Sequence, residues 1–226
     1  MNLERKRNYS IDGLRGVAIG LMLFHHFVYI LAEYKKIEID MLSHPFWSNF
    51  PKLIIFIFLF TSGISLSLSM ESSFKVKSYL KRLIKLLLGA IFISGYSYLL
   101  FPDKWIYFGI LHCILFCNIL VIPFLRLSWV ALFIAVIIFL IPFMFKFEYP
   151  WFLLPQFTYD YEPPLPWFGA MLLGVFFNNV FFKSRQGWDK KDISGWGRWL
   201  AFLGRHSFLI YLVHYPVILT VLYFKE

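Results

Sequence analysis

The sequence predicts an all-α, polytopic integral membrane bundle of about seven transmembrane helices. Hydrophobic residues make up 59% of the 226, and the mean hydropathy is +0.66, which is more apolar surface than a soluble domain of this size can bury. No segment alternates polar and apolar residues over barrel-length strands. Helices are therefore the remaining way to satisfy the backbone polar groups inside lipid.

Seven apolar runs are each long enough to cross about 30 Å of hydrocarbon, which takes about 20 residues of helix. No linker rich in Gly, Ser or Pro divides the chain and no repeat is evident, so residues 1–226 are predicted to form a single membrane-embedded domain. In order, the predicted spans are 12–33, 48–70, 80–101, 105–124, 127–145, 164–182 and 199–224.

The net charge of +9 follows a membrane pattern and does not predict nucleic acid as a partner. Basic residues gather before the first span and in alternate loops, whereas the intervening loops mix lysines with acidic residues. The positive-inside rule then places the amino terminus in the cytoplasm and the carboxyl terminus outside. The cytoplasmic basic residues are Arg5, Lys6, Arg7, Lys75, Lys77, Lys81, Arg82, Lys85, Lys183, Arg185, Lys190, Lys191 and Arg198.

Histidines form a layer in the outer half of the predicted bundle. Ionisable groups inside a membrane are costly, so each is a functional-site hypothesis. Counting about 1.5 Å per helical residue puts His26, His112 and His214 at similar depth, where they could share one pocket. His25 points about 100° away from His26, so at most one of these two should face that pocket. The alternative is that each histidine only packs helices together.

Arginines form a second layer near the cytoplasmic ends. Arg15, Arg82 and Arg205 could bind the phosphates of a nucleotide-bearing acyl donor such as coenzyme A, because a guanidinium matches phosphate oxygens with two parallel hydrogen bonds. The alternatives are that Arg82 reaches lipid headgroups and that Arg15 pairs with Asp12. Cys113 and Cys117 have no further ligands at metal spacing, so no metal is expected.

Five strings, taken together, resemble a known family over nearly the whole chain. The resemblance is to the bacterial branch of the heparan-alpha-glucosaminide N-acetyltransferase catalytic-domain family, and the first string is also similar to the membrane acyltransferase type 3 family. The strings are Ile11-Asp12-Gly13-Leu14-Arg15-Gly16-Val17-Ala18, Phe58-Leu59-Phe60-Thr61-Ser62-Gly63, Phe108-Gly109-Ile110-Leu111-His112, Pro164-Leu165-Pro166-Trp167-Phe168-Gly169, and Leu203-Gly204-Arg205-His206-Ser207 through Tyr211-Leu212-Val213-His214.

The resemblance implies a membrane-bound acyltransferase of the bacterial cytoplasmic membrane. We expect it to move an acyl group, with acetyl from acetyl-CoA as the favoured case, from cytosolic acyl-CoA to an amine or hydroxyl of an extracytoplasmic glycan or amino sugar. Heparan itself is not the expected acceptor. The two families nominate different bases. The type 3 family places its histidine at His26, whereas the heparan enzymes have asparagine there and place theirs in the outer segment, at His44.

The remaining site predictions concern the transition state and the acceptor. His112 and His214 are candidates for stabilising the oxyanion. Asp160 and Tyr161, in the outer loop 146–163, are candidates for binding the sugar; the alternative for Asp160 is an exposed loop charge. Two other classes of function stay open, a small-solute or proton-coupled transporter and a non-catalytic membrane subunit. Membrane lipids are expected partners, and a homo-oligomer is one open alternative for the assembly.

Overall fold

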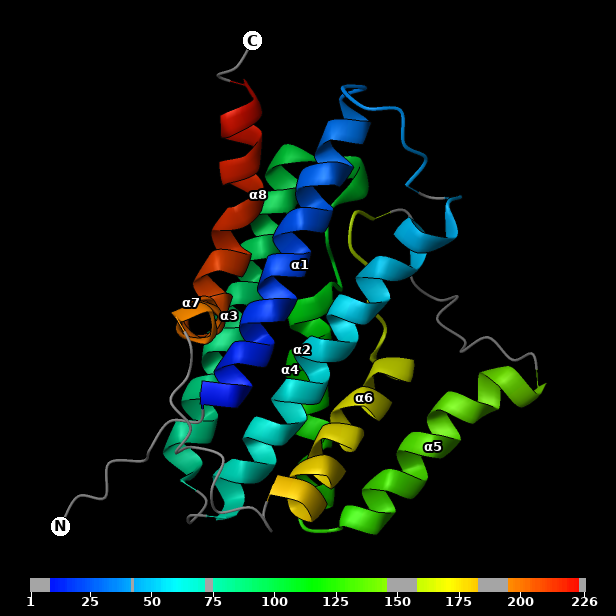
Figure 1. Cartoon of the computed structure of the whole chain (residues 1–226), viewed down its shortest axis with the longest axis vertical. Coiled ribbons are helices and arrows are strands. Elements are labelled where there is room, and N and C mark those ends of the chain that lie inside the picture. The colour runs from blue at the N-terminus through cyan, green and yellow to red at the C-terminus, as the bar shows by residue number, and fades with distance from the viewer. Residues whose placement is uncertain (1–8, 42, 72–74, 146–157, 183–194, 224–226) are drawn as a thin grey trace, which may run out of the picture. The chain divides into compact units, whose positions relative to one another are not determined.

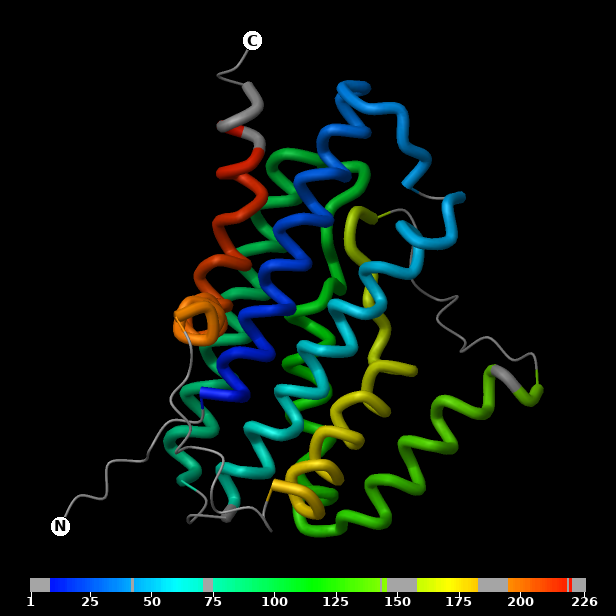
Figure 2. The backbone as a smooth tube through the Cα atoms, in the orientation of Figure 1, coloured from blue at the N-terminus to red at the C-terminus, as the bar shows by residue number. Residues whose placement is uncertain are grey.

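The structure is a computed structural model that describes residues 9–41, 43–71, 75–145, 158–182 and 195–223. Across these ranges the chain is helical, with one isolated parallel bridge between Phe108 and Tyr161 (Figure 1). The chain divides into two compact units, residues 1–58 with 185–226, and residues 59–184. Helix α2 (Pro45–Glu71) runs unbroken from the first unit into the second (Figure 2). The predicted single domain stays a prediction.

The first unit is built from α1 (Tyr9–Glu33), the first half of α2, α7 (Gly195–Arg205) and α8 (Ser207–Tyr223). Its core centres on three buried apolar side chains from α1 and α2, with partly buried side chains of α8 packed against them. The central residues are Ile19, Met22 and Ile54, and the α8 residues are Ile210 and Tyr211.

Glycines let α1 and α7 cross with their backbones in contact. A Cβ on Gly16 would collide with the carbonyl oxygen of Leu200, and a Cβ on Gly204 would collide with that of Asp12. Small residues at a crossing are the usual way for membrane helices to approach closely. The crossing brings the carboxyl end of α7 to the first turns of α1.

The second unit contains the rest of α2 with α3 (Val76–Leu100), α4 (Ile110–Leu120), α5 (Ser128–Phe145) and α6 (Pro164–Phe177). Short 3-10 turns (Pro102–Lys104 and Ile122–Phe124) flank α4, and a π-helical turn (Asn178–Phe182) follows α6. Helices α2 and α6 cross at a second glycine pair, since a Cβ on Gly63 would collide with Met171 and one on Gly174 with Phe60.

The distribution of side chains is that of a membrane protein. Large apolar side chains of α3 and α5 are exposed, among them Leu88, Ile91 and Phe133, whereas polar Thr61 and Asn118 are fully buried. Such broad apolar surface calls for lipid around it. Among the residues that the structure describes, four helices are long and apolar enough to span a membrane and three others are apolar but shorter. An all-α membrane bundle is therefore confirmed, while the number seven stays a prediction.

The predicted start of the seventh span is wrong for a physical reason. The sequence predicts one helix over 199–224, but the chain turns at His206 and the apolar helix α8 begins only at Ser207. The preceding α7 is amphipathic, and its apolar residues continue directly into those of α8 in the sequence. Several residues predicted to lie outside the spans are not among the described residues. They are Arg5, Lys6, Arg7, Lys183, Arg185, Lys190, Lys191 and the range 146–157.

Candidate active site

Two of the predicted histidines meet in the first unit. The rings of His26 on α1 and His214 on α8 are 4.7 Å apart between centroids and nearly perpendicular. Nδ1 of His26 lies 3.0 Å from the carbonyl oxygen of Met22, and Nδ1 of His214 lies 2.6 Å from that of Tyr211. A carbonyl only accepts, so in each neutral ring Nδ1 carries the proton and Nε2 keeps its lone pair.

The Nε2 atom of His214 is buried and has no hydrogen-bond partner, in a side chain that is 7% exposed. Leaving a buried acceptor unsatisfied costs about 1–3 kcal/mol, so the atom calls for an explanation. A neutral His214 offers an acceptor and no spare donor, which bears on its predicted oxyanion role: only the protonated ring could fill it. The pair His26 and His214 thus presents lone pairs rather than protons.

His25 points elsewhere, in keeping with the helical geometry. Its ring packs 5.9 Å from that of Phe50 and 6.4 Å from that of Trp47, within an aromatic cluster that includes Phe24 and Phe46. Adjacent residues on a helix face different directions, and only His26 meets His214. His25 therefore serves as a matched position for testing His26.

His44 occupies a different environment, immediately before α2. Its side chain is exposed, and its Nδ1 accepts a hydrogen bond of 3.3 Å from the backbone N–H of Phe46. The ring therefore caps the helix, whose first residue, Pro45, has no N–H to satisfy. In this geometry the lone pair of His44 is engaged and its Nε2 carries the proton, the reverse of His26.

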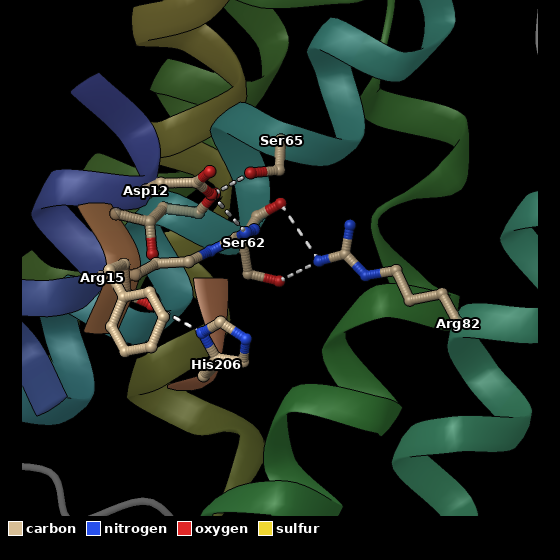
Figure 3. Close-up of polar contacts among 8 residues, drawn as sticks. Asp12, Arg15, Ser62, Ser65, Arg82 and His206 are labelled. Carbon is tan, nitrogen blue, oxygen red and sulfur yellow. Dashed lines mark hydrogen bonds and ion pairs between the residues drawn. The ribbon is translucent and has the colours of Figure 1, made fainter. Parts of the chain in front are cut away.

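Two of the predicted donor-binding arginines lie at the crossing of α1 and α7. Arg15 forms an ion pair of 3.8 Å with the buried Asp12 on the same helix face, and both are drawn in Figure 3. Arg205 is exposed and directly follows Gly204, whose backbone touches Asp12. The crossing accounts for the shared location of these two cations.

Arg82 belongs to the second unit, where it enters a buried polar cluster. Its Nη2 donates to Ser62 Oγ at 2.8 Å (Figure 3), and the amide of Asn118 donates to the same oxygen at 3.1 Å. The hydroxyl of Tyr79 donates to the carbonyl of Asn118. The sequence alone does not single out Ser62. An asparagine inside the apolar α4 was the available signal for this cluster.

The shared acceptor Ser62 leads to a stability prediction. Ser62→Ala is expected to lower the free energy of unfolding by about 2 kcal/mol, because Arg82 and Asn118 both lose a buried hydrogen-bond acceptor. Thermal unfolding in detergent measures the change. Ser69→Ala, which removes a hydroxyl bonded to the carbonyl of Leu66 in its own helix, is the control and should have a smaller effect. Equal effects would contradict a stabilising cluster.

His112 is engaged at both ring nitrogens in the second unit. Its Nδ1 accepts from the backbone N–H of Gly109 at 3.2 Å, and its Nε2 lies 3.3 Å from Ser94 Oγ. Ser94 already donates its proton to the carbonyl of Ile106, so it accepts from His112. The ring thus fastens the start of α4 to α3, which favours the packing interpretation of His112.

Asp160 and Tyr161 also lie at the start of α4. Asp160 Oδ2 accepts from the backbone N–H of Ile110 at 3.1 Å, and glycine at 109 leaves room for that carboxylate. Backbone hydrogen bonds from Tyr159 to Lys104 and from Glu162 to Phe108 tie the segment 158–162 to the chain before α4. Asp160 is therefore a helix-capping residue here.

A second tyrosine, missed by sequence reasoning, accompanies Tyr161. The rings of Tyr107 and Tyr161 are 5.7 Å apart, and each hydroxyl is buried without a hydrogen-bond partner. Burial, and then the neighbouring Tyr107, raise the pKa of Tyr161 above its ordinary value, so its phenol keeps its proton. The pair offers two donors that nothing in the fold uses. An isolated tyrosine before a helix gives no sequence signal.

In the part of the chain that the structure describes, no three His, Cys, Asp or Glu side chains are placed to bind a metal ion together. No curated protein and no solved structure matches the chain. The family model for the catalytic region of heparan-alpha-glucosaminide N-acetyltransferase matches residues 7–216, which include both histidines of the pair and all three arginines. The chain therefore belongs to this family of acetyltransferase-type membrane enzymes.

Proposed function

We propose that the protein transfers an acetyl group from cytosolic acetyl-CoA to an amine or hydroxyl of an extracytoplasmic amino sugar or glycan. The observation that carries the proposal is the pair His26 and His214, in which a hydrogen bond to a backbone carbonyl places the proton of each neutral ring on Nδ1 and leaves the Nε2 lone pair available. Such an imidazole can take a proton from an attacking nucleophile at neutral pH. Family membership supplies the acetyl chemistry.

The proposed reaction balances as a direct transfer. The acceptor nitrogen or oxygen attacks the thioester carbonyl and gives its proton to Nε2 of His26. The carbon–sulfur bond then breaks, the new amide or ester bond is complete, and the proton passes to the departing thiolate. His214 Nε2, an acceptor beside the His26 ring, would stabilise the protonated imidazole by receiving a hydrogen bond from it.

The donor and acceptor sites are assigned to the predicted residues. Arg15 and Arg205, at the α1 and α7 crossing of the first unit, would bind the donor's phosphates. A role for Arg82, held by Ser62 within the second unit, stays a separate prediction. His44 is the alternative base nominated by the heparan enzymes; it could act once its ring releases the N–H of Phe46. His112 would keep a supporting role at the start of α4.

Reconstitution tests the proposal directly. Purified protein in liposomes is given labelled acetyl-CoA on one side and glucosamine on the other, and acetylated sugar is expected in the compartment that received glucosamine. Protein-free liposomes control for leakage and for spontaneous transfer. Glucosamine flux without acetylation would favour a transporter instead. The absence of both flux and acetylation with several amino sugars would contradict the proposed function.

The tyrosine pair is the proposed acceptor subsite, beside the predicted Asp160. Sugar hydroxyls accept hydrogen bonds from phenols, and the covered hydroxyls of Tyr107 and Tyr161 would become available when the segment 158–162 opens. Tyr161→Phe and Tyr107→Phe are each expected to raise the KM for the acceptor about fivefold with little change in kcat, the effect of one lost hydrogen bond.

Steady-state kinetics with varied glucosamine measure this change. Tyr98→Phe, at an exposed phenol of α3, is the matched control and should leave KM unchanged. A purely structural role for the buried pair predicts the opposite outcome, higher thermal stability with no change in KM, because each substitution removes an unsatisfied buried hydroxyl.

A further inference from the structure

Helix α7 has an exposed aromatic surface that the catalytic proposal does not use. Its residues Ala201 and Gly204 are buried, whereas Trp196 is 84% exposed, Trp199 67% and Phe202 49%. At 100° per residue the aromatic side chains form one continuous arc. The arginines at 198 and 205 lie together on its edge, and α7 contains no acidic residue. The helix thus has a packed face, an aromatic face and a cationic edge.

The crossing with α1 fixes how α7 lies in a membrane. Figure 1 views α7 nearly along its axis, whereas α1 and α8 of the same unit extend along the picture. Helix α1 is long and apolar enough to span, so α7 runs across the spanning direction. Leu200 and Gly204 of α7 touch Gly16 and Asp12, which are within about 10 Å of the start of α1 at 1.5 Å per residue. That depth is interfacial.

We propose that α7 is an interfacial helix that binds anionic phospholipid headgroups of the cytoplasmic leaflet. Trp196, Trp199 and Phe202 would enter the boundary of the acyl chains, where aromatic side chains are favoured, and Arg198 would pair with a headgroup phosphate. The cytoplasmic leaflet carries the negative charge that complements this edge. Bound lipid would hold α7 on the first turns of α1, the segment that contains Arg15.

Lipid quenching tests the proposal without depending on catalysis. The protein is placed in nanodiscs of phosphatidylcholine containing phosphatidylglycerol, with bromine on the acyl chains of one lipid or the other. Tryptophan fluorescence is expected to be quenched more by brominated phosphatidylglycerol. In Trp196→Phe/Trp199→Phe this preference should disappear, while the quenching of the remaining tryptophans by both lipids persists.

Titration with phosphatidylglycerol tests whether the charge of Arg198 contributes to lipid binding. Arg198→Gln is expected to weaken the preference for phosphatidylglycerol over phosphatidylcholine about fivefold, since one basic residue near an anionic surface contributes about 1 kcal/mol. Arg126→Gln, at another exposed arginine, is the matched control and should keep it. Equal quenching by the two lipids, or equal loss in both arginine variants, would overturn the proposal. So would disulfide crosslinking of two copies through Trp196→Cys, which would assign the aromatic face to a dimer.

The lipid measurement and the acetyltransferase assay can contradict their two proposals separately. The effect of lipid on Arg15 rests on the proposed function, whereas the quenching preference does not. Loss of transfer in zwitterionic discs together with a quenching preference in mixed discs would support both inferences. A quenching preference with no transfer in any lipid would keep the interfacial helix and contradict the proposed function alone.

Discussion

Replacing His26 by alanine is expected to lower the rate of acetyl transfer about a thousandfold, the usual contribution of a general base. The Nδ1–H of His26 is held by the carbonyl of Met22, and its Nε2 lone pair is therefore fixed in one direction. Because the base acts in the transition state, the loss should fall on kcat while the KM for acetyl-CoA changes little. The liposome assay with labelled acetyl-CoA measures both quantities.

Two neighbouring histidines make the test specific. His25→Ala, on the same helix as His26, removes a ring from the aromatic cluster and should leave kcat within a few-fold of the parent value. His44→Ala removes a cap of α2, which costs about 1 kcal/mol of stability, and should also retain activity once the protein is folded. An inactive His44→Ala beside an active His26→Ala would assign the base to His44 instead.

The depth count located the histidine pair but could not assign the third ring. Helical rise alone placed His26 and His214 at one level, and the first unit brings them together. His112 was counted at the same level, yet its nitrogens are taken up by Gly109 and Ser94, next to the irregular segment before α4. The rise per residue gives the depth of a side chain within a helix. It does not predict the hydrogen bonds that an irregular segment before the helix makes with that side chain.

Other features were hidden because their partners are distant in sequence. Ser62 meets Asn118 and Arg82 only when three helices pack, and Tyr107 meets Tyr161 only when the outer segment folds back. The break at His206 was missed because the apolar residues of the amphipathic α7 merge with those of α8 in any averaged hydropathy. In contrast, the fold class could be predicted, because it depends on the apolar composition of each segment, which is read directly from the sequence.

Family strings also combine packing with chemistry. Gly16 stands beside Arg15, and Gly204 beside Arg205, so each string pairs a cation with the glycine that lets its helix approach the other. Gly109 leaves room for the Asp160 carboxylate in the same way. These glycines therefore act on the proposed site through backbone placement. Substitution of Gly16 or Gly204 should disturb donor binding by separating α1 from α7, without removing any reacting group.

Gly16→Ala is accordingly expected to destabilise the protein by about 3 kcal/mol or more, because the added methyl group would collide with the backbone carbonyl of Leu200, which cannot rotate away as a side chain can. Gly20→Ala, one turn later on the same helix, is the matched control. Nothing lies within 4 Å of its Cβ position, so alanine should be neutral or stabilise by up to about 1 kcal/mol through helix propensity.

Thermal unfolding of both variants in detergent measures the difference, and Gly204→Ala should reproduce the effect of Gly16→Ala because its Cβ meets the carbonyl of Asp12 at the same crossing. The double variant should then lose less than the sum of the two single changes, since helices already separated at one point no longer collide at the other. Full additivity would mean that the two glycines act independently, and equal stability of Gly16→Ala and Gly20→Ala would contradict the close crossing of α1 and α7.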